Sequence, residues 1–224
     1  MLRRRFGTVS IDDPRENAAV APYTFFLPSE NELLAIVPGD QVKIIVRSHP
    51  PSPEWDAERM WFTVTVASGE HLTGTLDNQP HDIPQLLPGA MLRFRRSDVT
   101  DIIWGADRLT APPRPTPRRE YWDRCLVDQC VLDGDALVHF LYREQPDPAT
   151  LDDEYPDSGW RIRGDYRNVD DAELDDREVA YVALGAVLNR DDRWLHLIDA
   201  PIGSGFIRDW TSHRFDADNP DTRN

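Results

Sequence analysis

The sequence predicts an α+β protein with two domains. The first is a small, strongly bent antiparallel β-sheet or partial barrel with a short helix, and the second is an α+β domain with a β-hairpin. Short segments of alternating apolar and polar residues, separated by glycine and proline turns, predict the strands. A chain of 224 residues accommodates two domains, and a proline-rich run interrupts it at residues 111–119. We therefore expect domains at residues 1–110 and 120–210, a linker between them and a flexible tail at 211–224.

The first domain opens with 20 residues that carry no strong period, and we expect a loosely held arm or one short strand there. Ser29 is suited to cap a short helix that runs through Ile36, because Glu32 completes a capping box. The turn at residues 68–69 predicts a hairpin between two of the strands that follow. Four strands are expected, at residues 41–47, 60–66, 71–76 and 91–95.

The linker contains four prolines in nine residues. Prolines at this density favour an extended, semi-stiff polyproline spacer. Such a run also suits docking into an SH3-like groove of another protein, and this alternative stays open beside the spacer interpretation.

The second domain should begin with a strand at residues 124–131, which turns at 133–134 and returns at 136–142 as a hairpin. Cys125 and Cys130 lie five positions apart on the first of these strands. Side chains alternate along a strand, so the two thiols should point to opposite faces and act as buried structural residues. This geometry disfavours a disulfide, and a zinc site needs more ligands than the pair offers.

The rest of the second domain mixes short elements. An acidic loop at residues 147–157 leads into a strand at 158–162. Residues 179–188 alternate like a strand in their first part and suit a helix in their second, so both remain open. A short helix should cover 191–198, and residues 201–206 close the domain.

The acidic charge is concentrated in the second half of the chain. The net charge is −15, with 14 Lys and Arg against 15 Asp and Glu in residues 1–119, and 11 against 25 in residues 120–224. Such a surface repels nucleic acid and attracts a basic partner, although many acidic surfaces serve only solubility. We expect no nucleic-acid partner.

The sequence contains none of the usual catalytic motifs, and we expect no enzyme and no cofactor. A phosphate-binding loop, a nucleophile elbow and a metalloprotease helix are all missing. Gly203-Ser204-Gly205 is a weak match to a phosphate loop, because it lacks the strand and helix that such a loop joins. His139 and His196 are expected in structural roles, and no metal site is predicted.

Four polar residues of the second half are candidates for one cluster: Arg143, Glu144, Asp157 and Arg161. Enzymes use such carboxylates as acids or bases. Neighbouring arginines lower the pKa of a carboxyl, however, which suits an ion-pair network better than proton transfer. We therefore predict a structural network, which Gly203 and Phe206 complete.

The chain starts with three arginines but no apolar run follows them, and no stretch approaches the length of a membrane span. We therefore expect a cytoplasmic protein with no membrane partner.

The second half resembles the immunity protein 33 family, formerly domain of unknown function 2185. The resemblance covers residues 124–209 and rests on four blocks in the family's order: Tyr142-Arg143-Glu144-x-Pro146, Asp157-Ser158-Gly159-Trp160-Arg161, Gly164-Asp165 and Pro201-Ile202-Gly203-Ser204-Gly205-Phe206. The chain departs from the family in the loop before Asp157, which is longer and more acidic, and at Arg167, which makes its surroundings more basic.

The first half resembles the domain of unknown function 2314 family over residues 54–104. The matching residues are Glu58-Arg59-Met60-Trp61 and Gly74-Thr75-Leu76-Asp77-Asn78-x-Pro80, followed by Pro88-Gly89 and Ser97-Asp98. Neither resemblance implies a known reaction or catalytic residues.

The immunity resemblance implies a non-catalytic protein that binds and neutralises a bacterial toxin. The acidic half suits a basic toxin such as a nuclease. A general cytosolic protein- or peptide-binding module is the alternative, and an uncharacterised enzyme is a third possibility. The expected contact residues lie in the exposed acidic loop: Asp152, Asp153, Glu154 and Tyr155. Trp160 is either a core residue or a further binding anchor, since tryptophan is enriched at both places.

Overall fold

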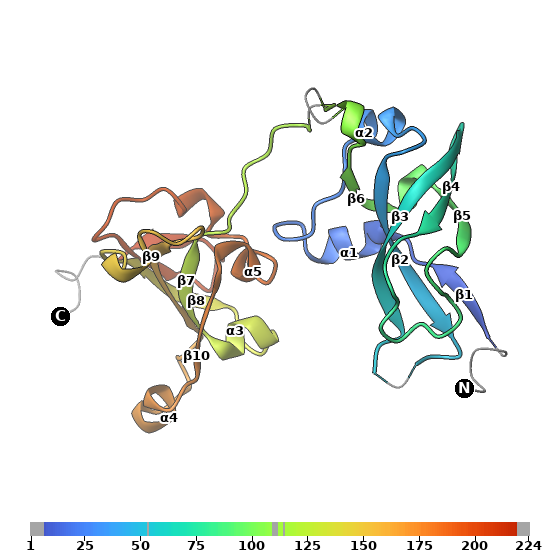
Figure 1. The fold of residues 1–224 in the computed structure, drawn as a ribbon. Helices are drawn as coiled ribbons and strands as arrows, with labels where there is room; N and C mark the ends of the chain where they lie inside the picture. The colour runs from blue at the N-terminus through green and yellow to red at the C-terminus, as the bar shows by residue number, and fades with distance from the viewer. Residues whose placement is uncertain (1–6, 53, 109–111, 114, 219–224) are drawn as a thin grey trace. The chain divides into compact units, whose positions relative to one another are not determined.

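The computed structural model of the chain describes residues 7–52, 54–108, 112–113 and 115–218 (Figure 1). Chain contacts divide it into two compact units. Its two sheets and few short helices confirm the α+β class. The first unit contains the described residues up to Val20 together with Phe25–Arg118, and the second contains Ala21–Thr24 and the residues from Arg119 onward. The predicted domain boundaries stay a prediction, and Ala21–Thr24 is a short excursion into the second unit that the sequence pattern does not reveal.

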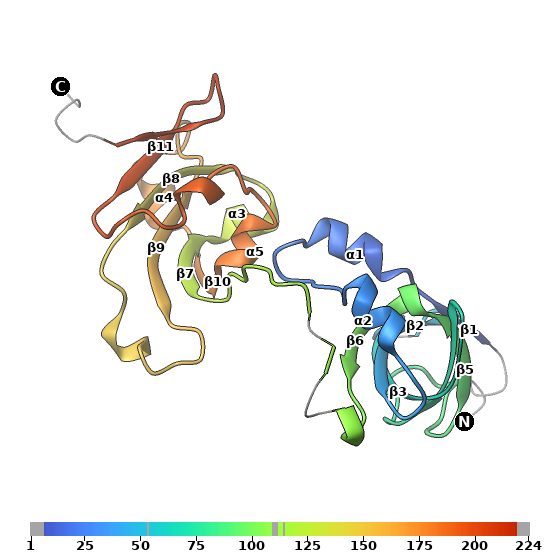
Figure 2. The same cartoon turned by 90° about the horizontal axis from the view of Figure 1, so that it is seen from above.

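The first unit is built on a curled antiparallel sheet. Its strands are β1 (Thr8–Ile11), β2 (Gln41–His49), β3 (Ala57–Ser68), β4 (His71–Leu76), β5 (Met91–Arg95) and β6 (Val99–Ile103). They follow the order β1-β2-β3-β4-β5, and β6 also pairs with β2. The sheet bends into a nearly closed barrel, which is visible when the strands are seen from above (Figure 2). The four predicted strands and the predicted hairpin of β3 and β4 are confirmed.

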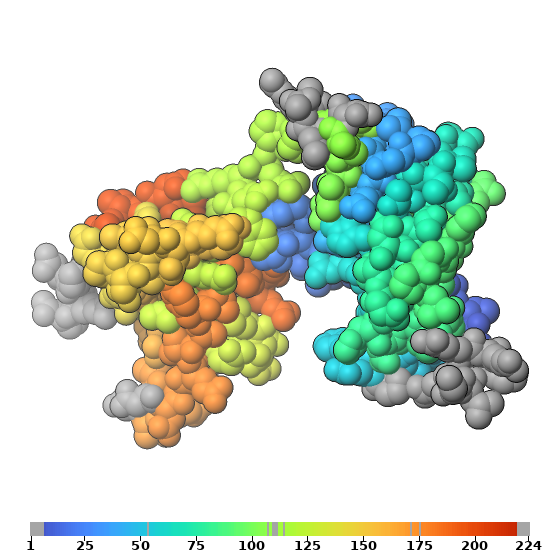
Figure 3. All heavy atoms as spheres, viewed as in Figure 1, coloured from blue at the N-terminus to red at the C-terminus, as the bar shows by residue number. Residues whose placement is uncertain are grey.

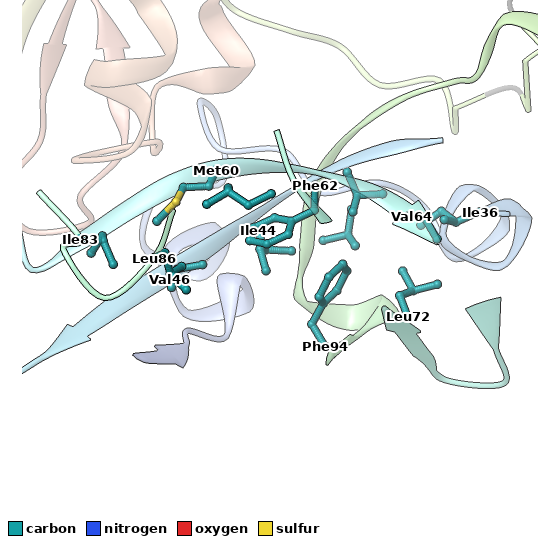
Figure 4. Packing of buried hydrophobic residues seen from close by; sticks show 13 residues of the cluster. Ile36, Ile44, Val46, Met60, Phe62, Val64, Leu72, Ile83, Leu86 and Phe94 are labelled. Atoms are coloured by element: carbon teal, nitrogen blue, oxygen red, sulfur yellow. The ribbon is translucent and has the colours of Figure 1, made fainter. Parts of the chain in front are cut away.

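The core of this unit comes from the inward-facing side chains of the strands together with Ile36, Ile83 and Leu86 (Figure 4). Ile44, Met60 and Phe62 are fully buried. The rings of Phe62 and Phe94 lie 5.8 Å apart between their centroids. Gly74 permits the close approach of β4 to β3, because a Cβ there would lie 2.9 Å from the Cβ of Phe62. Full burial of each such side chain contributes about 1.5–3 kcal/mol.

The short helices of the first unit are α1 (Pro14–Val20) and α2 (Glu30–Ala35). The predicted capping box of α2 is confirmed, because the Ser29 N–H donates to Glu32 at 2.8 Å and the Ser29 hydroxyl accepts from the Glu32 N–H. At the other end, the buried Arg96 guanidinium donates to the carbonyls of Leu33 and Ile36. In the first 20 residues, the short strand is confirmed as β1, whereas α1 was not predicted.

Polar residues of the region that resembles the domain of unknown function 2314 family hold residues 77–82 onto β3. The Glu58 carboxylate accepts hydrogen bonds from the backbone N–H groups of His81 and Asp82. Asn78 Oδ1 accepts the Trp61 N–H at 2.8 Å, and Asp77 accepts from a threonine hydroxyl of β3. These residues therefore have structural roles.

The second unit is built on a mixed sheet with the order β10-β7-β9-β8-β11-β12. Its strands are β7 (Arg124–Asp128), β8 (Val138–Arg143), β9 (Asp157–Gly164), β10 (Val179–Ala183), β11 (Gly205–Arg208) and β12 (Phe215–Ala217). Strands β7 and β9 are parallel, and the other pairs are antiparallel. The helices are α3 (Gln129–Asp133), α4 (Asp171–Asp175) and α5 (Leu184–Leu188), with 3-10 turns at Pro148–Thr150 and Leu195–Leu197.

The hairpin predicted for residues 124–131 and 136–142 is wrong. Strand β9 lies between β7 and β8, and residues 129–133 form α3. Gly134, which indicated a hairpin turn, instead ends this helix with a φ of 85°, a conformation that glycine adopts without strain. A hairpin does exist in this unit, between β11 and β12.

The flexible tail predicted from residue 211 is wrong for β12. Phe215 is buried in the core of the unit and pairs with Arg208 of β11. Residues 219–224 of that predicted tail lie outside the described residues.

The predicted burial is confirmed for Cys125, whereas Cys130 does not lie on the predicted strand and is not fully buried. Cys125 is fully buried on the core face of β7, and burial raises the pKa of its thiol to about 12. Cys130 lies in α3 and is only partly buried, and both thiols are free. The ambiguous segment 179–188 is a strand followed by a helix, and the helix predicted at 191–198 is only the 3-10 turn Leu195–Leu197.

Candidate functional site

One face of the second sheet packs on the core, and the other keeps much of its surface open. The strand registers place one residue of each of five neighbouring strands in a row across the open face: Tyr181, Leu126, Arg161, Tyr142 and Gly205. Arg161 is buried in the middle of this row, whereas the flanking tyrosines are partly or largely exposed. We call this surface the open face.

An ion-pair network lies on the open face. The Arg161 Nη1 and Nη2 atoms donate to the two oxygens of Asp157 at 2.9 and 2.8 Å, and its Nε donates to Glu144 at 2.6 Å. Asp157 and Arg161 are 4% and 9% exposed, whereas the Glu144 side chain is 49% exposed. The structure therefore brings together three of the four predicted network residues.

Burial by itself acts to raise the pKa of the Asp157 carboxyl. Hydrogen bonds outweigh burial, first from the Arg161 guanidinium and then from two backbone N–H groups, so the pKa of Asp157 lies below its ordinary value. The same hydrogen bond, between the Arg161 guanidinium and Asp157, raises the pKa of Arg161. Asp157 is therefore ionised near neutral pH and suits a structural ion pair better than proton donation.

Asp157 also anchors the acidic loop. Its Oδ2 accepts the Asp147 N–H at 2.9 Å, and its own N–H donates to the Thr150 hydroxyl at 3.0 Å. The short 3-10 turn Pro148–Thr150 lies between these contacts. Both ends of the loop are thereby fixed to the start of β9, so the loop presents its tip from a rigid strand.

The predicted contact residues lie at this tip. Asp152, Asp153 and Glu154 are exposed, and Tyr155 is partly exposed, with its ring centroid 6.0 Å from that of Trp122. The part of the chain around residue 150, drawn in yellow, lies on the molecular surface (Figure 3). Their role as contacts stays a prediction.

Arg143 is held apart from the ion pairs. Its guanidinium donates to the carbonyls of Ser158 and Ala200 at 3.1 and 2.8 Å. Its backbone carbonyl accepts the Gly203 N–H at 2.7 Å, which connects β8 to the turn before β11. Gly203 has a φ of 90°, in the left-handed region that favours glycine.

Gly159 is required by the same packing. Its φ is 81°, and a Cβ there would overlap the carbonyl oxygen of Glu144. The Glu144 N–H donates to the Gly159 carbonyl at 2.9 Å. This contact brings Glu144 within reach of the network.

Of the two roles left open for Trp160, the structure shows the core residue, and the further role as a binding anchor is not compatible with its burial. It is 0% exposed, its ring centroid lies 5.8 Å from that of Trp194, and its Nε1 donates to the Ile198 carbonyl. Trp160 alternates with Arg161 along β9 and so points to the opposite face of the sheet. Phe206 packs beside Trp160 and belongs to the same core.

Lowering the pH should weaken this network through Asp157. Its folded-state pKa lies below the ordinary value of 3.8, so the unfolded chain binds the proton first. The stabilisation is present above that value and is lost as the pH falls through the folded-state pKa. The Gly159 amide should exchange more slowly in the native protein than in Asp157→Asn. This difference in protection should shrink below pH 3.8. A difference in protection that stays constant as the pH falls further would contradict the lowered pKa of Asp157.

One family model matches the second half of the chain. Residues 125–217 match the immunity protein Imm33 domain. The matched residues, which we call the Imm33 domain, extend from Cys125 in β7 to the end of β12 and contain the network and the acidic loop. The resemblance of the second half to this family is thus confirmed, and it supports an immunity role in general. Immunity families are generally non-catalytic. No curated protein and no solved structure matches the chain. The resemblance of the first half stays a prediction.

No group of three or more His, Cys, Asp or Glu side chains in the described part of the chain is arranged to hold a metal ion. Within the same residues, no helix is long and apolar enough to cross a bilayer. His139, predicted to be structural, accepts the Trp210 Nε1–H at 2.8 Å inside the Imm33 domain.

The sequence pattern missed the aromatic residues of the open face. Phe140, Tyr142 and Tyr181 alternate with core residues along β8 and β10, and this alternation was the available signal. Alternation within one strand does not show which strands lie side by side, so it does not place these three rings on one surface.

Proposed function

We propose that this protein is a non-catalytic immunity protein that neutralises a basic protein toxin by binding it in the cytoplasm. The Imm33 match carries the proposal, because it supports an immunity role for the half of the chain that holds the acidic charge. The paired and ionised state of Asp157 is consistent with binding without chemistry.

The electrostatics favour a basic partner. Residues 120–224 hold 25 acidic against 11 basic residues, and several of the carboxylates stand exposed on the anchored loop. Long-range attraction of this kind speeds the encounter of oppositely charged proteins and weakens as salt increases. The same charge disfavours nucleic acid.

The decisive test is rescue of growth. A toxin-like open reading frame that adjoins this gene would be expressed alone and together with the full-length chain. Rescue by the native chain, with a stoichiometric complex recovered from the cells, supports the proposal. If every adjoining product is harmless or kills despite co-expression, the proposal fails and the general binding module becomes the better account.

Neutralising the acidic loop should slow association with the toxin. The variant Asp152→Asn, Asp153→Asn, Glu154→Gln should reduce the association rate constant about tenfold at low salt, with a smaller effect on dissociation. Stopped-flow or surface-based kinetics at two salt concentrations would measure both constants.

The matched control removes the same charge elsewhere in the Imm33 domain, by Glu173→Gln, Asp176→Asn and Glu178→Gln, all three exposed. This variant should reduce the association rate much less. Equal reductions would show that only total charge matters, and equal affinity at low and high salt would exclude charge steering altogether.

A further inference from the structure

Strand β10 forms one edge of the second sheet. Among the strands of the described residues, it pairs with β7 alone. Its sequence, Val179-Ala180-Tyr181-Val182-Ala183, contains no charge and no proline. Soluble proteins usually protect an edge strand by such residues or by a short length, because its unpaired backbone groups bind readily to another strand. The opposite edge, β12, is shorter and carries the exposed Asp216.

Two backbone hydrogen bonds flank β10 and fix its alternation. The Gln129 N–H donates to the Glu178 carbonyl at 2.8 Å, and the Leu184 N–H donates to the Asp123 carbonyl at 2.9 Å. Both pairs continue the register of β10 on β7, which runs without a shift. In an antiparallel pair, residues that bond across to the partner alternate with residues whose backbone groups point away from it. The even-numbered residues of β10 therefore bond to β7.

The odd-numbered residues of β10 direct their backbone N–H and C=O groups away from the sheet. Val179 and Tyr181 are 49% and 45% exposed, whereas Ala183 is buried. Ala180 and Val182, the bonded residues between them, pack against the core. Two donors and two acceptors are thus accessible at Val179 and Tyr181, with the spacing that an added strand requires. We call these two residues the free edge.

The acidic loop lies beside the Tyr181 end of the free edge. A hydrogen bond joins the side chains of Tyr181 and Thr150. Burial, and after it the negative charges of Asp157 and Asp153, raises the pKa of the Tyr181 phenol, while the Arg124 charge acts in the opposite direction. The three exposed carboxylates of the loop tip outnumber this arginine, so the surface beside the ring is acidic.

Three more arginines lie on β9 or just before β10, and carboxylates balance them. Arg161 is paired with two carboxylates of the network. Arg163 and Arg177 share the Asp128 carboxylate, and the exposed Glu178 offsets the positive charge that remains. An incoming strand therefore meets excess negative charge at the end of β10 beside the acidic loop.

The charge also decides which occupant suits this edge. Two β10 strands of separate copies would bring together two halves that each hold 25 acidic against 11 basic residues, and such halves repel each other. A strand with lysine or arginine along one face meets opposite charge instead. The edge is therefore suited to a basic segment rather than to a second copy.

We propose that the free edge binds an extended basic segment of the partner as an added strand, with its cationic side chains on the open face beside the acidic loop; this inference rests on the proposed function and names how the partner is held. Backbone hydrogen bonds to Val179 and Tyr181 supply the attachment, as in other cases of strand addition. The carboxylates of the loop select the charge of the segment.

The test uses the ¹⁵N-labelled full-length chain and a capped heptapeptide of alternating lysine and valine. At about nine-tenths saturation, the Val179 and Tyr181 amides should exchange about tenfold more slowly, because they exchange only while the peptide is absent. The Ala180 and Val182 amides, already bonded to β7, should change much less. The control peptide is N-methylated at every residue, so it keeps its charge but has no backbone donors, and it should have no such effect.

Four outcomes would overturn the proposal. Equal slowing at all four amides would indicate general stabilisation, and equal slowing by both peptides would indicate attraction by charge alone. Absence of slowing at Val179 and Tyr181 would show that the edge does not accept a strand. Slowing that increases with protein concentration and needs no peptide would identify a second copy as the occupant.

Two variants of one residue separate the backbone from the ring. Tyr181→Pro removes the outward N–H and leaves the bonds to β7 intact, and it should weaken the peptide about tenfold. Tyr181→Val removes the ring but keeps the N–H, and it should weaken the peptide no more than about threefold. Slow exchange of the Ala180 and Val182 amides establishes that β10 stays paired in both variants.

Equal weakening by the two variants would assign the binding to the ring and overturn the strand addition. Because the probe is a peptide, this failure is distinguishable from failure of the proposed function. A chain that rescues growth but whose free edge ignores the peptide is an immunity protein that holds its toxin elsewhere.

Discussion

Replacing Trp160 with alanine should lower the free energy of unfolding of the Imm33 domain by about 3–5 kcal/mol. The side chain is 0% exposed and packs on Trp194 and Phe206. Its removal leaves a cavity between sheet and helices and strips the Ile198 carbonyl of its hydrogen bond. The loss would be a large part of the stability of an ordinary domain.

Hydrogen exchange of β7 and β9 amides in the full-length chain would measure this loss. The control is Trp55→Ala, at a tryptophan of the first unit that is 57% exposed, and it should change stability by no more than about 0.5 kcal/mol. If Trp160→Ala instead retained native protection but lost the toxin, Trp160 would be a contact residue after all.

Replacing Arg161 with methionine should cost about 3–5 kcal/mol, because it leaves the buried Asp157 carboxylate without its partner. Both acceptor oxygens of Asp157 lose a charged donor, while the backbone N–H groups of Asp147 and Gly159 still bind them. The hydrogen bond that holds the acidic loop to Asp157 should weaken, so the Asp147 amide should exchange faster.

Adding Asp157→Asn to Arg161→Met should recover part of the loss, because the neutral amide costs less to bury than an unpaired charge. The exposed pair of Arg119 and Asp199 is the control, since both side chains are more than half exposed. Arg119→Met should cost about 0–1 kcal/mol. A similar small cost for Arg161→Met would show that Asp157 is solvated in solution.

Local signals predicted strands β2 to β5 and helix α2 of the first unit. The capping box of Ser29 and Glu32 depends on residues three positions apart, and the hairpin of β3 and β4 depends on a two-residue turn. Both are settled by neighbouring residues, so the pattern is sufficient. Strand β6 was missed, since its pairing with β2 joins residues far apart in the chain.

The errors in the second unit share one cause. Gly134 suits a hairpin turn and a helix end equally, and the choice depends on β9, which arrives later in the sequence and inserts between β7 and β8. The local sequence around Phe215 predicts a polar tail, whereas in the structure Phe215 belongs to β12 and pairs with β11. A local pattern contains no information about which distant strand becomes the neighbour.

Some features of the candidate site were likewise predicted from the sequence, and others required the structure. The exposed acidic loop and the pairing of its flanking carboxylate with arginine were predicted from composition and charge. The opposite directions of Trp160 and Arg161, and the free edge of β10, required the sheet.

By itself, the sequence determined the α+β class, strands β2 to β5 of the first unit, the acidic bias of the second half and its resemblance to an immunity family. Only the tertiary structure decided the strand order, the burial of Trp160 and the surface on which Tyr142 and Glu144 meet. Charge and short-range capping are properties of neighbouring residues. Strand order and burial arise from contacts between residues distant in the chain, whose free energies are comparable for several arrangements until the whole core is packed.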